Sequence, residues 1–177
     1  MNGGAALRWL RAGVLLAFGV WGLGVALGRS SWGFLDGVNL IFHEAGHPIF
    51  ALGGQFPGIL GGSAMQVLVP AVCAVAFLWR GEAFGAGLCG IWTGESLVNV
   101  SIYMADARAQ RLPLLGGDDV IHDWNFLLGR LGLLHWDRAL GGATAVLAGL
   151  LIAASAVLAA LACLRPDPSQ ATTDPKG

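Results

Sequence analysis

Long apolar stretches alternate with short polar breaks along most of this chain. Five of these stretches are close to the length that an α-helix needs to cross a bilayer, about 17–25 residues. Because the apolar residues run continuously over these lengths, they predict helices rather than the short alternating segments of a β-sheet. The five expected helices cover residues 9–27, 33–53, 60–79, 83–105 and 139–164.

The composition supports membrane helices over a soluble bundle. The chain has 177 residues, of which 55% are hydrophobic and 12% are charged, whereas about a quarter of the residues in a soluble domain are charged. We therefore expect an all-α, polytopic integral membrane bundle of about five transmembrane helices. It forms one domain over residues 1–165, followed by a disordered tail over residues 166–177. The net charge of −1 argues against a nucleic-acid-binding protein, which would carry a basic patch.

The charges outside the apolar stretches predict an orientation. With five crossings and a cytoplasmic N-terminus, six arginines face the cytoplasm and four basic residues face the other side, which agrees with the positive-inside rule. Between the last two stretches, residues 124–136 have apolar side chains at helical spacing, and we expect them to lie in the membrane interface. The six arginines are Arg8, Arg11, Arg108, Arg111, Arg130 and Arg138.

The second apolar stretch carries more polar residues than a lipid-facing helix tolerates. A charged residue at the centre of a bilayer costs about 2.5–3.5 kcal/mol, so these side chains need partners. At about 100° per residue they fall on one arc of the helix, and we expect this face to look into a polar cavity. The alternative is that neighbouring helices satisfy each polar side chain separately. The residues are Asp36, Asn39, His43, Glu44 and His47.

Within this stretch, residues 43–47 read His-Glu-Ala-Gly-His. Residues four apart share one face of a helix, so the imidazoles of His43 and His47 can reach the same metal ion. Glu44 points about 100° away from His43, where it can act on a water molecule bound to the metal. The pattern therefore predicts a Zn²⁺ site with His43 and His47 as ligands and Glu44 as the catalytic base.

A catalytic zinc ion normally has three protein ligands and one open position, and the sequence leaves the third ligand open. We favour His122, which is followed by the carboxylate of Asp123. The next candidate is Glu95 on the fourth helix, and Asp106 and Asp123 follow it. The alternative for His122 is an ordinary histidine of a surface loop.

Two further helices carry polar residues that can support this site. If the second and fourth helices run in the same direction, Glu95 lies at about the depth of His43 and Asn99 lies near His47. Gln66 on the third helix can bond a reacting carbonyl or link two helices, and we favour the link. The supporting residues that we expect are Asn99, Asp106, Asp123 and Gln66.

A His-Glu-x-x-His pattern inside a membrane helix resembles the site-2-type intramembrane zinc metalloproteases. The resemblance implies a zinc ion held by His43, His47 and a downstream carboxylate, with Glu44 activating water. That family has its third ligand in an Asp-Gly segment of a later helix, whereas the only Leu-Asp-Gly of this chain, residues 35–37, precedes the pattern. The segments NVSIYMADARAQRLPLLGG and HDWNFLLGRLGLL are similar to a group of small bacterial membrane proteins, which implies a shared fold and the bacterial inner membrane.

These observations predict a zinc metalloendopeptidase that hydrolyses peptide bonds in or at the membrane. Its expected partners are the lipid bilayer and a membrane-protein or peptide substrate. Two alternatives stay open. One is a membrane protein that binds or handles metal without catalysis, and the other is a proteolytically inactive relative that binds a membrane partner.

Overall fold

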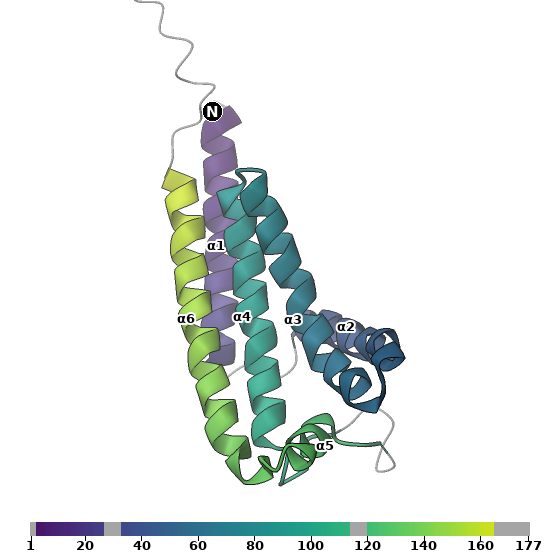
Figure 1. Cartoon of the computed structure of the whole chain (residues 1–177). Helices are drawn as coiled ribbons and strands as arrows, with labels where there is room; N and C mark the ends of the chain where they lie inside the picture. The colour runs from purple at the N-terminus through teal and green to yellow at the C-terminus, as the bar shows by residue number, and fades with distance from the viewer. Residues whose placement is uncertain (1–2, 27–32, 114–119, 165–177) are drawn as a thin grey trace, which may run out of the picture.

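The computed structural model describes residues 3–26, 33–113 and 120–164. All regular elements in these ranges are helices, and none is a strand (Figure 1). The tail that we predicted to be disordered, residues 166–177, lies outside the described residues. The elements are α1 (Gly3–Ala26), α2 (Phe34–Phe50), η1 (Ala51–Gly53), α3 (Gln55–Trp79), α4 (Ala83–Ala105), α5 (Asp123–Arg130), η3 (Leu134–Trp136) and α6 (Asp137–Leu164).

The helices coincide with the apolar stretches, so the predicted all-α fold is confirmed. The fourth stretch matches α4 at both ends, and α3 begins five residues before the expected start at residue 60. The predicted interfacial segment is divided into α5 and η3. Between η1 and α3, Gly54 has a φ of 103°, a left-handed conformation that glycine adopts without steric cost. This turn reverses the chain so that α3 packs back against α2.

The helices α1, α4 and α6 run side by side, α3 is inclined to them, and α2 lies at a steep angle (Figure 1). Small residues allow the closest approaches. A Cβ atom on Gly87 of α4 would lie 2.7 Å from Cβ of Ala159 on α6, and one on Gly90 would lie 2.3 Å from Oγ of Ser155. Such small-residue contacts are typical of helix packing in membranes.

The crossing of α2 and α3 depends on two facing glycines. A Cβ atom on Gly46 would lie 2.1 Å from the carbonyl oxygen of Gly61, and one on Gly61 would lie 2.5 Å from the carbonyl oxygen of Gly46. No larger side chain fits at either position without separating the helices. The close approach brings the histidine face of α2 directly onto α3.

The structure separates two arginines that the five-crossing prediction places on the same, cytoplasmic side, namely Arg11 and Arg108. The guanidinium carbon of Arg11 lies 5.5 Å from the centre of the Phe84 ring, so the first half of α1 lies beside the start of α4. Arg108 follows the other end of α4, whose 23 residues span roughly 34 Å. Arg11 and Arg108 therefore lie at opposite ends, because α2 crosses the bundle obliquely. The cytoplasmic N-terminus stays a prediction.

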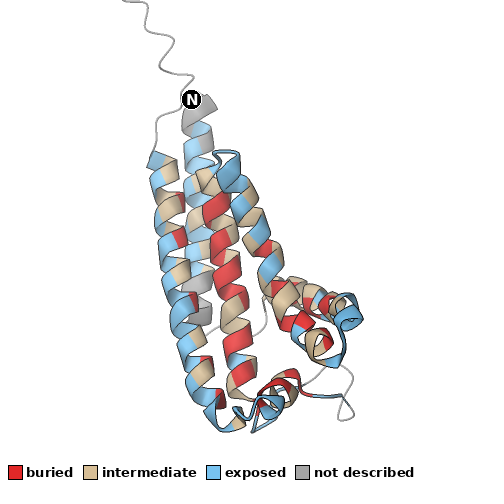
Figure 2. Ribbon diagram, in the orientation of Figure 1, coloured by how far each residue is buried: buried red, intermediate tan, exposed pale blue. Residues whose placement is uncertain are grey.

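Two of the described helical segments, residues 55–79 and 134–164, are long and apolar enough to cross a membrane. The count of five crossings stays a prediction. Large apolar side chains are exposed on the outer faces of the helices, while the most continuous buried surface follows α4 (Figure 2). Several of the buried residues are polar, namely Asn39, His43, Ser63, Gln66, Thr93, Glu95, Ser96 and Ser101.

Candidate metal centre

The two histidines of the His-Glu-x-x-His pattern lie on the face of α2 that packs against the rest of the bundle. Their ring centroids are 4.9 Å apart, and the ring planes meet at 80°. The side chain of His43 is 11% exposed and that of His47 is 28% exposed. Spacing of four residues on a helix therefore brings both imidazoles to one point, as the sequence predicts.

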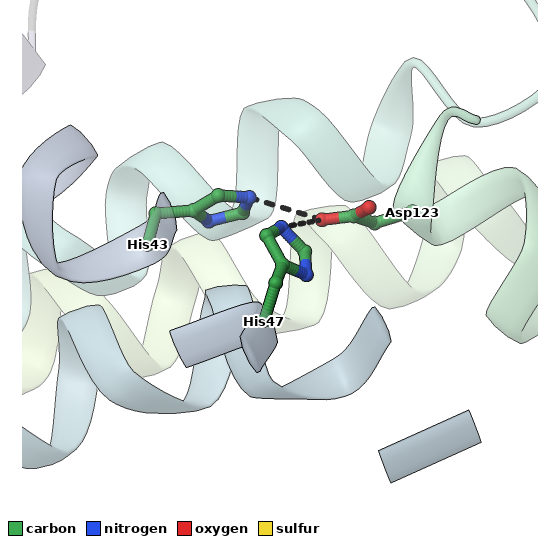
Figure 3. Close-up of side chains that lie close together, drawn as sticks. All are labelled: His43, His47 and Asp123. Atoms are coloured by element: carbon green, nitrogen blue, oxygen red, sulfur yellow. Dashed lines mark ion pairs between the residues drawn. The ribbon is translucent and has the colours of Figure 1, made fainter. Parts of the chain in front are cut away.

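Asp123, the first residue of α5, completes the group (Figure 3). Its Oδ2 atom lies 3.0 Å from Nε2 of His43 and 3.5 Å from Nε2 of His47. The three ligand atoms lie within 4.8 Å of one another. Atoms that bind a tetrahedral zinc ion at 2.0–2.1 Å stand roughly 3.3 Å apart, so the carboxylate is at ligand distance from both nitrogens.

The other nitrogen of each imidazole is fixed by a hydrogen-bond acceptor. Nδ1 of His47 lies 3.0 Å from the carbonyl oxygen of Gly58. Nδ1 of His43 lies 2.9 Å from Oε1 of Gln66, whose Nε2 donates to the carbonyl oxygen of Ser96 at 3.2 Å. Since a carbonyl oxygen only accepts, each Nδ1 carries the proton, and each Nε2 presents a lone pair.

Three atoms that can bind a metal ion, two imidazole nitrogens and one carboxylate oxygen, therefore converge. Oδ2 of Asp123 is buried and has no hydrogen-bond partner among the described residues. An unpartnered buried carboxylate oxygen is costly. A cation at the point of convergence, either a shared proton or a metal ion, satisfies all three atoms.

The structure also leaves room beside the two imidazoles. Gly62 of α3 faces them, and a Cβ atom there would lie 2.7 Å from Nε2 of His43 and 2.7 Å from Nε2 of His47. Only glycine leaves this space open. Two imidazole nitrogens and one carboxylate oxygen are a ligand set typical of catalytic zinc, so the group fits a divalent metal ion with a further position for water or substrate.

Glu44 directly follows His43 on α2. The side chain of His47 is more exposed than that of His43, and Glu44 continues in the same rotational direction around the helix. Glu44 itself is exposed. The Glu44 carboxylate therefore lies on the more accessible side of the histidine face of α2.

His122, the favoured third ligand, is not part of this group. Its Nδ1 accepts a hydrogen bond from the backbone N–H of Asn125 at 3.3 Å, and its Nε2 lies 3.6 Å from Oδ2 of Asp106. Both ring nitrogens thus face groups other than the two histidines. Burial lowers the pKa of His122 below its usual value, which favours the neutral imidazole.

Glu95, the next candidate ligand, is also engaged elsewhere. It is 1% exposed, and its two oxygens accept hydrogen bonds from Asn39 at 2.5 Å and from Asn99 at 2.6 Å. Oδ1 of Asn39 in turn accepts from Trp92 and Ser96. Glu95 is thus level with Asn39, one turn before His43, and this network joins α2 to α4.

The remaining expected residues have structural partners. Asp106 accepts hydrogen bonds from the backbone N–H groups of Arg111 and Leu112 and so shapes the chain after α4. Gln66 links α2 to α4 through His43 and Ser96, which is the linking role that we favoured. Asp36 accepts from the backbone N–H of Gly33 and caps its own helix.

Gly62 and Ser63 escaped the sequence analysis, and Tyr103 was recognised only as part of the polar stripe of the fourth helix, together with Glu95, Asn99 and Asp106. Gly62 provides the space, Ser63 accepts a hydrogen bond from the Trp124 indole at 3.1 Å, and Tyr103 accepts one from the backbone N–H of Asp123 at 3.0 Å. The Gly61-Gly62-Ser63 run inside an apolar helix was an available signal, because adjacent small residues mark a close approach.

Comparisons with known proteins do not assign the chain to a family. No family model, curated protein or solved structure matches the chain.

Proposed function

We propose that this protein is a membrane-embedded zinc metallopeptidase that hydrolyses peptide bonds at the membrane. The observation that carries the proposal is the convergence of His43 Nε2, His47 Nε2 and Asp123 Oδ2, with each Nδ1 bonded to a carbonyl oxygen. Two histidines and one carboxylate from a separate helix match the ligand chemistry of catalytic zinc sites.

The residues of the chain divide the work of hydrolysis. A zinc ion, when bound, supplies the Lewis acid that polarises the peptide carbonyl and activates water. Glu44 accepts a proton from the attacking water as the new C–O bond forms. It then donates that proton to the amide nitrogen as the C–N bond breaks. Gln66 and the carbonyl of Gly58 keep the imidazoles aligned throughout.

The exposed surface supports a place in the membrane. Large apolar side chains face outward and polar ones lie inside, an arrangement expected where lipid replaces water. α2 has 17 residues and reaches roughly 26 Å, short of a hydrocarbon layer of about 30 Å. Of the five predicted crossings, α2 is therefore the shortest.

The metal centre lies toward one end of this arrangement. The ring of His43 is 6.0 Å from that of Tyr103, which is two residues before the end of α4 at Ala105. Asp123 belongs to the short α5 at the same end (Figure 1). A peptide bond bound at this end of the bundle lies near the membrane surface and not at the midplane. The substrate class that we propose is therefore a membrane protein or peptide that is cleaved close to the interface.

The first experiment is elemental mass spectrometry of protein purified in detergent without chelator and resupplied with zinc. We expect about one zinc per chain, lost in His47→Ala and Asp123→Asn and retained in Glu95→Gln. If zinc were retained in Asp123→Asn and lost in Glu95→Gln, the third ligand would be Glu95 and not Asp123. A wild-type protein without zinc would refute the metal centre.

The second experiment separates catalysis from metal binding. Zinc-loaded protein is incubated with a library of model transmembrane peptides in detergent, and products are identified by mass spectrometry. Glu44→Gln should retain zinc and lose turnover. Equal turnover in Glu44→Gln and the wild type would refute the role of Glu44, and zinc binding without any product would favour a metal-binding protein over a peptidase.

A further inference from the structure

His122 lies at the junction of α4 and α5 and is almost completely buried. Its side chain is 1% exposed, although it precedes the short α5 at the edge of the bundle. A buried histidine beside a candidate ligand has either a structural or a chemical purpose. Two of its contacts bear on this question: the backbone N–H of Asn125 in the first turn of α5, and the ring of Tyr103.

The imidazole is the N-cap of α5. Nδ1 of His122 accepts from the N–H of Asn125, and the carbonyl of His122 accepts from the N–H of Phe126 at 3.1 Å. An accepting Nδ1 means that Nε2 carries the proton. Nε2 lies 3.6 Å from Oδ2 of Asp106 and has no hydrogen-bond partner among the described residues, so the hydrogen bond that holds the ring is the one at Nδ1.

The flat face of the ring packs on Tyr103. The centroids of the two rings are 4.3 Å apart and the planes are inclined by 40°. The hydroxyl of the same tyrosine accepts a hydrogen bond from the N–H of Asp123, and its ring also contacts that of His43 edge to face. Tyr103 therefore lies between one metal-binding histidine and His122.

We propose that His122, together with Tyr103, is a positioning residue for the carboxylate of Asp123 rather than a metal ligand. The inference rests on the metal centre proposed above. His122 fixes the first turn of α5 through its cap, and Tyr103 fixes the N–H of Asp123. With both constraints, the Oδ2 atom is presented to the two histidines before a metal ion binds, which reduces the ordering that binding must supply.

Two variants separate the cap from the ring. His122→Asn keeps a side-chain oxygen that can cap α5, since asparagine is among the best N-cap residues, but it removes the aromatic ring. His122→Phe keeps a ring against Tyr103 and removes both nitrogens. Tyr103→Phe keeps its ring and removes only the hydroxyl that accepts from Asp123.

The measurement is the affinity of purified protein for Zn²⁺, by competition with a chromophoric chelator, and the visible spectrum of the Co²⁺-loaded protein. We expect His122→Phe and Tyr103→Phe to weaken zinc binding by about 10- to 100-fold, and His122→Asn to weaken it less. The Co²⁺ bands of His122→Asn should keep the wild-type positions because the ligand set is unchanged, whereas Asp123→Asn should shift or abolish them.

Other results overturn the inference. A shifted Co²⁺ spectrum in His122→Asn would make the imidazole a ligand. Wild-type affinity in both His122→Phe and Tyr103→Phe would leave them without a positioning role, even though the metal centre itself stands. Failure of the wild-type protein to bind either ion would remove the metal centre and this inference together. Helix content by circular dichroism shows whether each variant is folded.

Discussion

Gly62 provides the sharpest test of where a metal ion would lie. In Gly62→Ala, the added Cβ would meet Nε2 of His43, and both Nε2 and Cε1 of His47, at 2.7 Å. Unbonded atoms of these types approach to about 3.5 Å, so the rings must withdraw by roughly 0.8 Å. The helix backbone itself accepts alanine well. The substitution therefore acts on the imidazoles and not on the fold.

The imidazoles have little freedom to withdraw. Gln66 and the carbonyl of Gly58 hold their Nδ1 atoms, and moving either ring breaks that bond or turns Nε2 away from Asp123. Zinc–nitrogen bonds vary by only about 0.2 Å around their ideal length, so a shift of this size removes at least one ligand. We expect Gly62→Ala to lose zinc affinity by more than 100-fold, beyond the range for outer-shell changes.

The assay is zinc competition with a chromophoric chelator in detergent, with zinc content by elemental mass spectrometry. Gly37→Ala is the matched control. It changes another glycine inside a helix of the site, α2, and its Cβ would have no neighbour within 4 Å. The control should bind zinc like the wild type. If Gly62→Ala also bound zinc with wild-type affinity, the space beside the two imidazoles would not be the metal position.

Three further predictions follow from the same geometry. Gln66→Leu removes the acceptor from Nδ1 of His43 and should weaken zinc binding by about 10- to 100-fold; unchanged affinity in chelator competition would contradict this role. Zinc at 100 times its Kd should stabilise the wild type by about 2.7 kcal/mol, seen as a higher Tm in detergent, and a Tm insensitive to chelator would contradict binding to the folded state. Leu128→Ala should lower the stability of the α4–α5 contact by about 2–5 kcal/mol, because Leu128 is 2% exposed, whereas Leu131, 57% exposed, is the control and should tolerate alanine; equal Tm values would refute the packing argument.

The sequence predicted the helices well, because each helix is determined locally by the length of its apolar stretch and by the turn or polar residues that end it. Residues 83–105 form α4 at the expected bounds, since the Arg80-Gly81 turn and the polar residues after Ala105 end the apolar stretch on both sides. The direction of α2 was not predictable in this way. Periodicity identifies the face of a helix that is buried, but the steep crossing depends on the contact between Gly46 and Gly61, which are 15 positions apart.

The two site residues on a single helix were predictable, whereas the residue contributed by the segment between α4 and α5 was not. His43 and His47 lie side by side because residues four apart share one face of a helix. Asp123 and His122 are neighbours, and either can face the histidines until the start of α5 is known. The cap that His122 provides turns its own ring toward Asp106 and leaves the carboxylate of Asp123 directed at α2. A one-residue difference at the helix start decides this choice.

The ligands of the proposed site come from parts of the chain that are made at different times. All of α3 and α4 lie between His47 and Asp123. A nascent chain that has just released α2 from the ribosome therefore has the histidines but not the carboxylate. The full ligand set exists only after α5 has been synthesised and has docked on the end of α4. In the proposed peptidase, hydrolysis would therefore begin only after α5 has docked.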